Sequence, residues 1–372
     1  MNFINGVEDT ISHPPFELRN RKALLLTDGR LGALGAKTAD CFIRYRPDDT
    51  AVVLDRVHAG KTVQDVLGFG GAVPIVDGVE RAASFAPDIA IVGVAPRGGG
   101  LSATLREDIL RCLDADMDIV NGLHVLLGND DEIRKSLRRS KSRIWDVRRA
   151  PDGKAVADGR GCVTGAKTVL LVGTDCGVGK MTVAYELYLE ARRRGINAAW
   201  AATGQTGMIL RGRGIAVDAV IGDYLSGAAE TLVNFEGQAK DIVFVEGQGS
   251  LLHPGYGAVT LGLMLGVMPD CMVLVHDLAK KTVKDYDAIE IPSMRDMMQY
   301  HQAVMLPVKK VPFAAVAART GALPLSSATE YLRDIEAETD LPAGDVIRFG
   351  CTEILDGVLA CLHPPRRQEG DN

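Results

Sequence analysis

The chain has 372 residues, of which 47% are hydrophobic and 24% charged, so we expect two soluble globular domains with sizeable cores. The net charge of −6 and the 5% of aromatic residues disfavour nucleic acid and anionic membranes as partners. The seven cysteines are scattered and never spaced C-x-x-C, which predicts reduced thiols and no metal site in a cytoplasmic protein.

The first half of the chain alternates short apolar runs with helical segments. Strands are expected at 22–27, 50–55, 73–76, 88–94 and 118–120, and helices up to residue 45 and at 78–85 and 102–115. This alternation predicts a parallel sheet with helices on both faces, that is, a Rossmann-like α/β domain over residues 1–150.

A glycine-containing turn follows the first expected strand. Gly29, Gly32 and Gly35 occur there, and the second strand ends at Asp55, an order found in the opening βαβ unit of nucleotide-binding sheets. The spacing differs from G-x-G-x-x-G, so a plain tight turn is the alternative that we favour.

The best domain boundary lies at residues 151–165, a stretch rich in Gly, Asp and Ala without apolar periodicity. The second domain, 151–372, restarts with a strand at 168–172, a helix at 182–194, a strand at 198–202 and a long polar loop. Further strands are expected at 241–245, 271–276 and 312–317. We predict a second α/β domain, of the P-loop type.

A phosphate-binding loop connects the strand at 168–172 to the next helix. Its ten residues are Gly173, Thr174, Asp175, Cys176, Gly177, Val178, Gly179, Lys180, Met181 and Thr182. Backbone N–H groups and a helix N-terminus attract an anion, the glycines permit the tight backbone, and the lysine adds a full charge. The loop therefore predicts a bound phosphate or pyrophosphate.

Two features of this loop depart from an Mg-nucleotide site. Gly173 lies one residue further from Gly179 than the G-x-x-x-x-G-K spacing allows. Met181 occupies the position of the hydroxyl that holds Mg²⁺, and a thioether is a poor ligand for a hard cation. Thr182 is displaced by about 100° around the helix. Phosphate binding is predicted, whereas nucleotide hydrolysis is in doubt.

Glu246 follows the expected strand at 241–245 and begins the sequence E-G-Q-G-S. A carboxylate at the carboxyl end of a strand faces the ligand crevice of an open α/β sheet. Glu246 is our leading candidate for a catalytic base or a metal-binding acid. The other candidate bases are Asp218, Asp223, His253 and His276.

Longer motifs give the sequence a resemblance to known families. G-T-D-C-G-V-G-K and V-E-G-Q-G-S-L-L-H-P resemble motifs of the dethiobiotin synthetases, which are ATP-dependent P-loop ligases. The second motif, with A-T-G-Q-T-G at 202–207, V-T-L-G-L at 259–263 and V-N-G-L-H at 120–124, is more similar to the bacterial family called domain of unknown function 1611. The residues at 69–76, 88–96 and 118–120 also resemble the CoA-binding domain of succinyl-CoA synthetases.

The second family includes D-glutamate N-acetyltransferases, so the resemblance implies acetyl transfer from acetyl-CoA to D-glutamate in D-amino-acid catabolism. We then expect a small-molecule substrate, a homo-oligomer, and substrate contacts from Gln205, Thr206, Arg211 and Gln248. Arg97, Arg213, Lys280 and Lys281 are further candidate cations. The alternative is an ATP- and Mg²⁺-dependent ligase or kinase, and a third possibility is a nucleotide sensor without turnover.

Overall fold

The computed structural model describes residues 10–96, 99–152 and 155–363 of the chain. The chain forms two compact units. The N-terminal unit comprises Ile11–Pro151 and Gly204–Ala219, and the C-terminal unit contains Asp152–Thr203 and the chain from Val220 onward. The segment Gly204–Ala219 thus belongs to the N-terminal unit, an arrangement that a single boundary near residue 150 does not describe.

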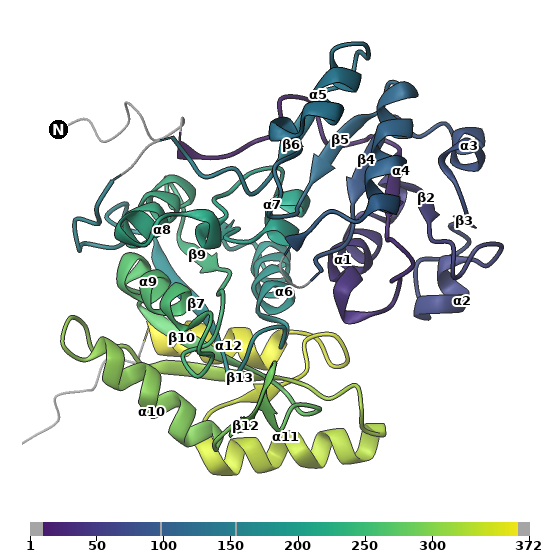
Figure 1. The fold of residues 1–372 in the computed structure, drawn as a ribbon. Helices are drawn as coiled ribbons and strands as arrows, with labels where there is room; N and C mark the ends of the chain where they lie inside the picture. Colours follow the sequence, from purple (N-terminus) through teal and green to yellow (C-terminus); the bar gives the residue numbers. More distant parts are fainter. Residues whose placement is uncertain (1–9, 97–98, 153–154, 364–372) are drawn as a thin grey trace, which may run out of the picture. The chain divides into compact units, whose positions relative to one another are not determined.

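A six-stranded parallel sheet forms the centre of the N-terminal unit (Figure 1). Its strands are β1 (Ala23–Leu26), β2 (Thr50–Leu54), β3 (Ile75–Val76), β4 (Ile89–Val92), β5 (Asp118–Asn121) and β6 (Ile144–Asp146). Their order is β3-β2-β1-β4-β5-β6, the order of a Rossmann sheet. The strands β1 and β4 are buried throughout, as their continuous apolar sequences predict.

Helices connect the strands of this sheet. They are α1 (Lys37–Tyr45), α2 (Val63–Leu67), α3 (Val79–Ala82), α4 (Ala103–Asp114) and α5 (Asp131–Leu137), with α7 (Gln205–Arg211) added from the second half of the chain. Short 3₁₀ turns lie at Leu34–Ala36, Pro47–Asp49, Ala83–Phe85, Leu127–Asn129 and Val217–Ala219. Helix α7 packs on α1, where Thr38 and Thr206 share a buried hydrogen bond of 2.8 Å.

The turn after β1 has the geometry of a tight structural turn. Gly29 and Gly32 have φ angles of +73° and +78°, which glycine adopts without strain. The buried carboxylate of Asp55 accepts hydrogen bonds from the Thr27 hydroxyl at 2.7 Å and the Leu31 amide at 2.9 Å. Local hydrogen bonds thus satisfy the Asp55 carboxylate at the end of β2, which supports the interpretation of this segment as a structural turn and not as a nucleotide-binding loop.

A second six-stranded parallel sheet forms the centre of the C-terminal unit (Figure 1). Its strands are β7 (Lys167–Gly173), β8 (Ala198–Ala201), β9 (Ile242–Val245), β10 (Cys271–Asp277), β13 (Phe313–Arg319) and β14 (Ala343–Gly344), in the order β14-β13-β10-β7-β9-β8. A separate antiparallel pair consists of β11 (Thr282–Val283) and β12 (Tyr286–Glu290).

Six helices of this unit are described, and they pack on its sheet and on one another. They are α6 (Lys180–Arg193), α8 (Gly222–Glu236), α9 (Gly257–Val267), α10 (Met294–Met305), α11 (Leu325–Thr339) and α12 (Thr352–Leu362). Helix α6 packs on α12, and α8 packs on α9. Across the described ranges, none of the helices combines the length and apolar character that crossing a membrane requires. The predicted fold class, two parallel α/β units, is confirmed.

One region that was expected to be an irregular loop is in fact folded. The polar loop expected after β8 contains α7 and the 15-residue helix α8. The charged stretch at 130–149, for which no helix or strand was predicted, contains α5 and the edge strand β6. In α8 the buried side chains recur at helical spacing, whereas α7 is buried almost all round and has no such periodicity.

Candidate functional site

The phosphate loop lies between the central strand β7 and helix α6. Strand β7 ends at Gly173, and α6 begins at Lys180. Gly177 and Gly179 have φ angles of +71° and +111°, so the backbone needs glycine at both positions. The N-cap residue of α6 is Gly179, which has no side chain to cap the helix, so the first turn of α6 opens onto the loop. This geometry suits an anion.

Lys180 is buried at the start of α6 and belongs to the loop. Its Nζ donates to the carbonyl of Asp175 at 3.0 Å and to the carbonyl of Gly249 at 2.7 Å. The segment after β9 approaches so closely that a Cβ on Gly247 would lie 1.6 Å from the Leu171 carbonyl oxygen. The ammonium group therefore links the phosphate loop to the segment 247–249.

Glu246 lies at the carboxyl end of β9, where its carboxylate is held on both oxygens. Oε2 accepts from the Thr203 amide at 3.2 Å, and Oε1 accepts from the Gln248 side chain at 2.9 Å. The Thr203 hydroxyl donates to the Glu246 carbonyl at 2.6 Å. Glu246 and Gln248 both follow β9, and Thr203 follows the neighbouring strand β8, so contacts from two strand ends orient the carboxylate. Thr203 was not foreseen, although it directly follows the strand A-A-W-A-A.

A basic segment after β10 is tied to the phosphate loop through Asp175. Lys280 donates to the Asp175 carboxylate and to the Cys176 carbonyl, each at 2.5 Å, and the Lys284 amide donates to the same carboxylate at 2.9 Å. Lys284 was not among the residues predicted from the sequence. It could have been predicted, because the basic segment K-K-T-V-K follows the carboxyl end of a strand in the same parallel sheet as the phosphate loop.

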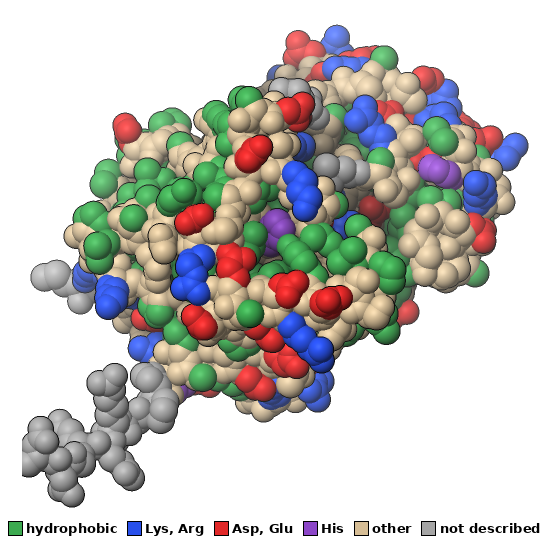
Figure 2. Space-filling view, turned by 90° about the horizontal axis from the view of Figure 1, so that it is seen from below, with side chains coloured by type: hydrophobic (Ala, Val, Ile, Leu, Met, Phe, Trp, Pro, Cys, Tyr) green, Lys and Arg blue, Asp and Glu red, His purple; other side chains and the backbone are tan. Residues whose placement is uncertain are grey.

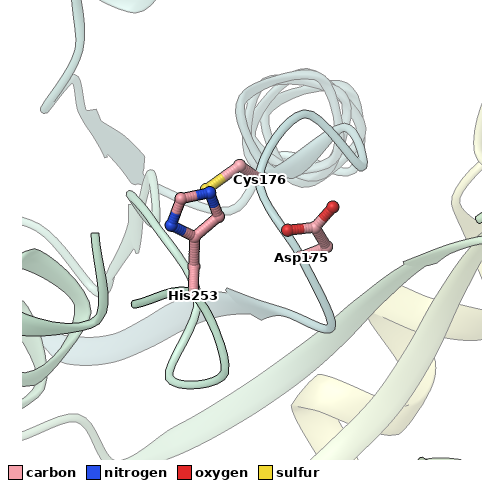
Figure 3. A group of neighbouring side chains, drawn as sticks. All are labelled: Asp175, Cys176 and His253. Atoms are coloured by element: carbon pink, nitrogen blue, oxygen red, sulfur yellow. The ribbon is translucent and has the colours of Figure 1, made fainter. Parts of the chain in front are cut away.

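Asp175, Cys176 and His253 come together beside the loop (Figure 3). One polar or sulfur atom of each lies within 4.8 Å of the other two. Burial raises the pKa of the Cys176 thiol above its ordinary value. The spacing of the cysteines did not predict this group, because its members come from segments far apart in the sequence.

His276 supports the loop from β10 in a neutral form. Its Nδ1 shares a hydrogen bond of 3.0 Å with the Thr174 hydroxyl. Burial lowers the pKa of His276 from its ordinary 6.5 to about 4. A base with so low a pKa is a weak proton acceptor at neutral pH, so His276 serves as a structural partner of Thr174.

We expect acid to destabilise the fold through His276. In the unfolded chain this imidazole binds a proton near its ordinary pKa of 6.5, whereas in the folded protein it does so only near pH 4. The contribution of the neutral, buried His276 to the free energy of unfolding is therefore complete above pH 6.5 and is lost as the pH falls to about 4. The free energy of unfolding should fall by about 1.4 kcal/mol per pH unit for this group. Denaturant titrations from pH 7.5 to 4.5 should show a shallower dependence in His276→Gln. The same change at the exposed His363 is the control, and equal slopes in wild type and His276→Gln would contradict this role.

Four predicted site residues belong to the N-terminal unit, where they make internal contacts. Arg148 pairs with the Asp218 carboxylate and donates to the Gln205 side chain at 2.5 Å. Thr206 contacts Thr38 as described above, and Arg211 ends α7. The long polar loop expected after the strand at 198–202 was wrong at these positions, since Gln205 and Thr206 are buried in helix α7. Their substrate contacts stay predictions.

The remaining candidates occupy varied positions. Met181 and Thr182 are partly buried in the first turn of α6, and Asp223 is exposed at the start of α8. Arg97 lies outside the described residues. Figure 2 shows Lys and Arg side chains interspersed with Asp and Glu over the visible face.

Comparison with known proteins agrees with this architecture. Residues 56–150 match the family described as "Domain of unknown function (DUF1611_N) Rossmann-like domain", and residues 155–355 match "Domain of unknown function (DUF1611_C) P-loop domain". A crystal structure of a DUF1611 family protein from Anabaena variabilis has a TM-score of 0.87 and 36% sequence identity. It covers 91% of this chain, which covers 99% of that one.

Two curated relatives carry the name D-glutamate N-acetyltransferase. The protein from Tritonibacter scottomollicae is 32% identical over 290 residues, which is 76% of this chain and 84% of the relative. The protein from Pseudoalteromonas sp. is 31% identical over 266 residues, which is 71% of this chain and 79% of the relative. With both domains matched over most of its length, the chain belongs to the DUF1611 family.

Proposed function

We propose that this protein is an acyltransferase that moves the acetyl group of acetyl-CoA to the amine of D-glutamate. The products are N-acetyl-D-glutamate and the free thiol of CoA, and the reaction serves the breakdown of D-amino acids. The observation that carries the proposal is the similarity to two D-glutamate N-acetyltransferases over more than two thirds of each chain.

The phosphate loop supports a donor that carries phosphate groups. Lys180 and the N-terminus of α6 supply positive charge for a diphosphate such as that of CoA. Holding a diphosphate requires no Mg²⁺. The thioether of Met181 at the usual position of the metal-binding hydroxyl is compatible with this use of the loop.

Acetyl transfer also needs a base and hydrogen-bond donors that stabilise the developing negative charge on the carbonyl oxygen. The attacking amine loses a proton as its nitrogen binds the thioester carbonyl, and the CoA sulfur leaves with the electron pair. Glu246 is the proposed base, since Thr203 and Gln248 hold its carboxylate in one orientation at a strand end. The backbone N–H groups of the segment 247–249 are candidate donors to the oxyanion.

The proposal predicts thiol release that depends on the acceptor. Adding D-glutamate to enzyme and acetyl-CoA should release CoA thiol without ATP or added Mg²⁺, because aminolysis of a thioester needs no nucleotide energy. A chromogenic disulfide reports the thiol, and mass spectrometry should identify N-acetyl-D-glutamate.

A neutral D-amino acid is one control, and it should react more slowly if cationic side chains bind the distal carboxylate. L-Glutamate is the second control, and it should react more slowly if the site distinguishes the configuration at the α-carbon. The rival function is the ATP- and Mg²⁺-dependent ligase or kinase, which the resemblance of the loop to dethiobiotin synthetases suggests. Formation of ADP with ATP and Mg²⁺, with no thiol release from acetyl-CoA, would replace the transferase by this rival.

A further inference from the structure

The group formed by Asp175, Cys176 and His253 has no part in the reaction proposed above. The carboxylate of Asp175 is fully buried, and 3% of His253 is exposed. Among the described residues, neither Oδ1 of Asp175 nor Nε2 of His253 has a hydrogen-bond partner. Buried polar atoms nearly always have hydrogen-bond partners, so these two atoms indicate that a further group binds at this part of the loop.

A zinc ion is the first explanation to test, because thiolate, imidazole and carboxylate are zinc ligands. The hydrogen bonding of His253 argues against it. The Gly255 amide donates to Nδ1 of His253 at 3.2 Å, so Nδ1 carries the lone pair and Nε2 carries the proton. A metal-bound imidazole has the reverse pattern, in which the second nitrogen donates its proton outward.

The same tautomer argues against His253 as a general base. A base needs its lone pair on the nitrogen that faces the reacting groups. Figure 3 shows the ring edge of His253 beside the Cys176 sulfur, at the turn of the phosphate loop. The ring therefore presents an N–H group to the loop from a buried position.

We propose that His253 is a neutral hydrogen-bond donor to the phosphate or diphosphate group bound by the loop. The Nε2–H group adds a side-chain donor to the backbone N–H groups and to Lys180. This inference rests on the phosphate-binding part of the proposed function and is independent of acetyl transfer.

The charges around the loop are compatible with an anion at this position. Asp175 is the acid in the group, and its carboxylate pairs with Lys280 at 2.5 Å and accepts from the Lys284 amide. Its charge is thus balanced within the protein. Lys180 and the N-terminus of α6 remain as the positive charges that face the ligand.

Two variants separate the donor role from a structural role. Glutamine at position 253 places an amide N–H₂ group near the position of Nε2, whereas asparagine places its oxygen near Nδ1, where it still accepts from the Gly255 amide. Inorganic pyrophosphate is the probe, and isothermal titration of the full chain is the measurement. We expect His253→Asn to bind pyrophosphate about 10- to 100-fold more weakly than wild type, and His253→Gln to recover most of the affinity.

The reverse order, with asparagine near wild type and glutamine impaired, would show that only the contact with Gly255 matters and would overturn the proposal. Failure of wild type to bind pyrophosphate would overturn it too. Nitrogen-15 spectra of wild type give a measurement that needs no variant, since they should show a protonated Nε2 whose shift changes on adding pyrophosphate.

Zinc is tested separately. One equivalent of tightly bound Zn²⁺ that is lost in both Cys176→Ser and His253→Gln would replace the donor by a metal site. Pyrophosphate binding that responds to the variants as expected, in a protein without acetyl transfer, would uphold this inference and reject the proposed reaction.

Discussion

Lys180→Ala is expected to weaken acetyl-CoA binding by about 10- to 100-fold, because a charge-assisted contact to the donor is lost. The fold is expected to stay intact. Lys180 now donates to the carbonyls of Asp175 and Gly249, both in polar loop segments outside the apolar core. We expect a bound diphosphate to accept hydrogen bonds from this ammonium group in place of the two carbonyls.

The dissociation constant from isothermal titration measures the effect, and thermal unfolding verifies the fold. Lys310→Ala removes the same charge from an exposed position and should bind acetyl-CoA like wild type. An unchanged dissociation constant in Lys180→Ala would mean that the loop serves the fold of this unit and not the donor.

Glu246→Gln should lower kcat by about 100-fold or more, the usual contribution of a general base, with little change in the affinity for acetyl-CoA. Glutamine keeps the shape of the side chain and one acceptor, but it does not take up a proton at neutral pH. Asp223→Asn, a matched change at an exposed acid that was also a candidate base, is the control and should keep the wild-type kcat.

The same variant distinguishes the rival reaction. If Glu246 holds Mg²⁺ for a nucleotide, Glu246→Gln should abolish ATP binding that depends on Mg²⁺, which titration with and without the metal detects. Because Glu246 adjoins the loop, its role as the base requires the acetyl group to reach this strand end. An unchanged kcat would place the reaction elsewhere in the protein.

Features encoded within short stretches were predicted well from the sequence. Continuous apolar runs such as A-L-L-L and I-A-I-V predict buried parallel strands, and β1 and β4 are such strands. The phosphate loop was predicted equally well, since its strand, glycines, lysine and helix follow one another directly in the sequence. The spacing of buried residues in α8 was also present in the sequence and was overlooked.

The assignment of α7 to a unit depended on tertiary structure. Gln205 and Thr206 follow a strand of the C-terminal unit directly, yet Arg148 and Thr38 of the N-terminal unit bind them. A helix buried almost all round has no apolar stripe, so its sequence does not indicate which sheet it covers.

The sequence by itself determined the two parallel α/β units, the phosphate loop and the acid after β9, because neighbouring residues form each of these features. Only the tertiary structure placed His253 beside Cys176 and joined Lys280 to Asp175. These pairs are separated by 77 and 105 positions in the sequence, and the order β10-β7-β9 brings their strand ends together. Strand order results from packing of the whole chain, which local residue patterns do not encode.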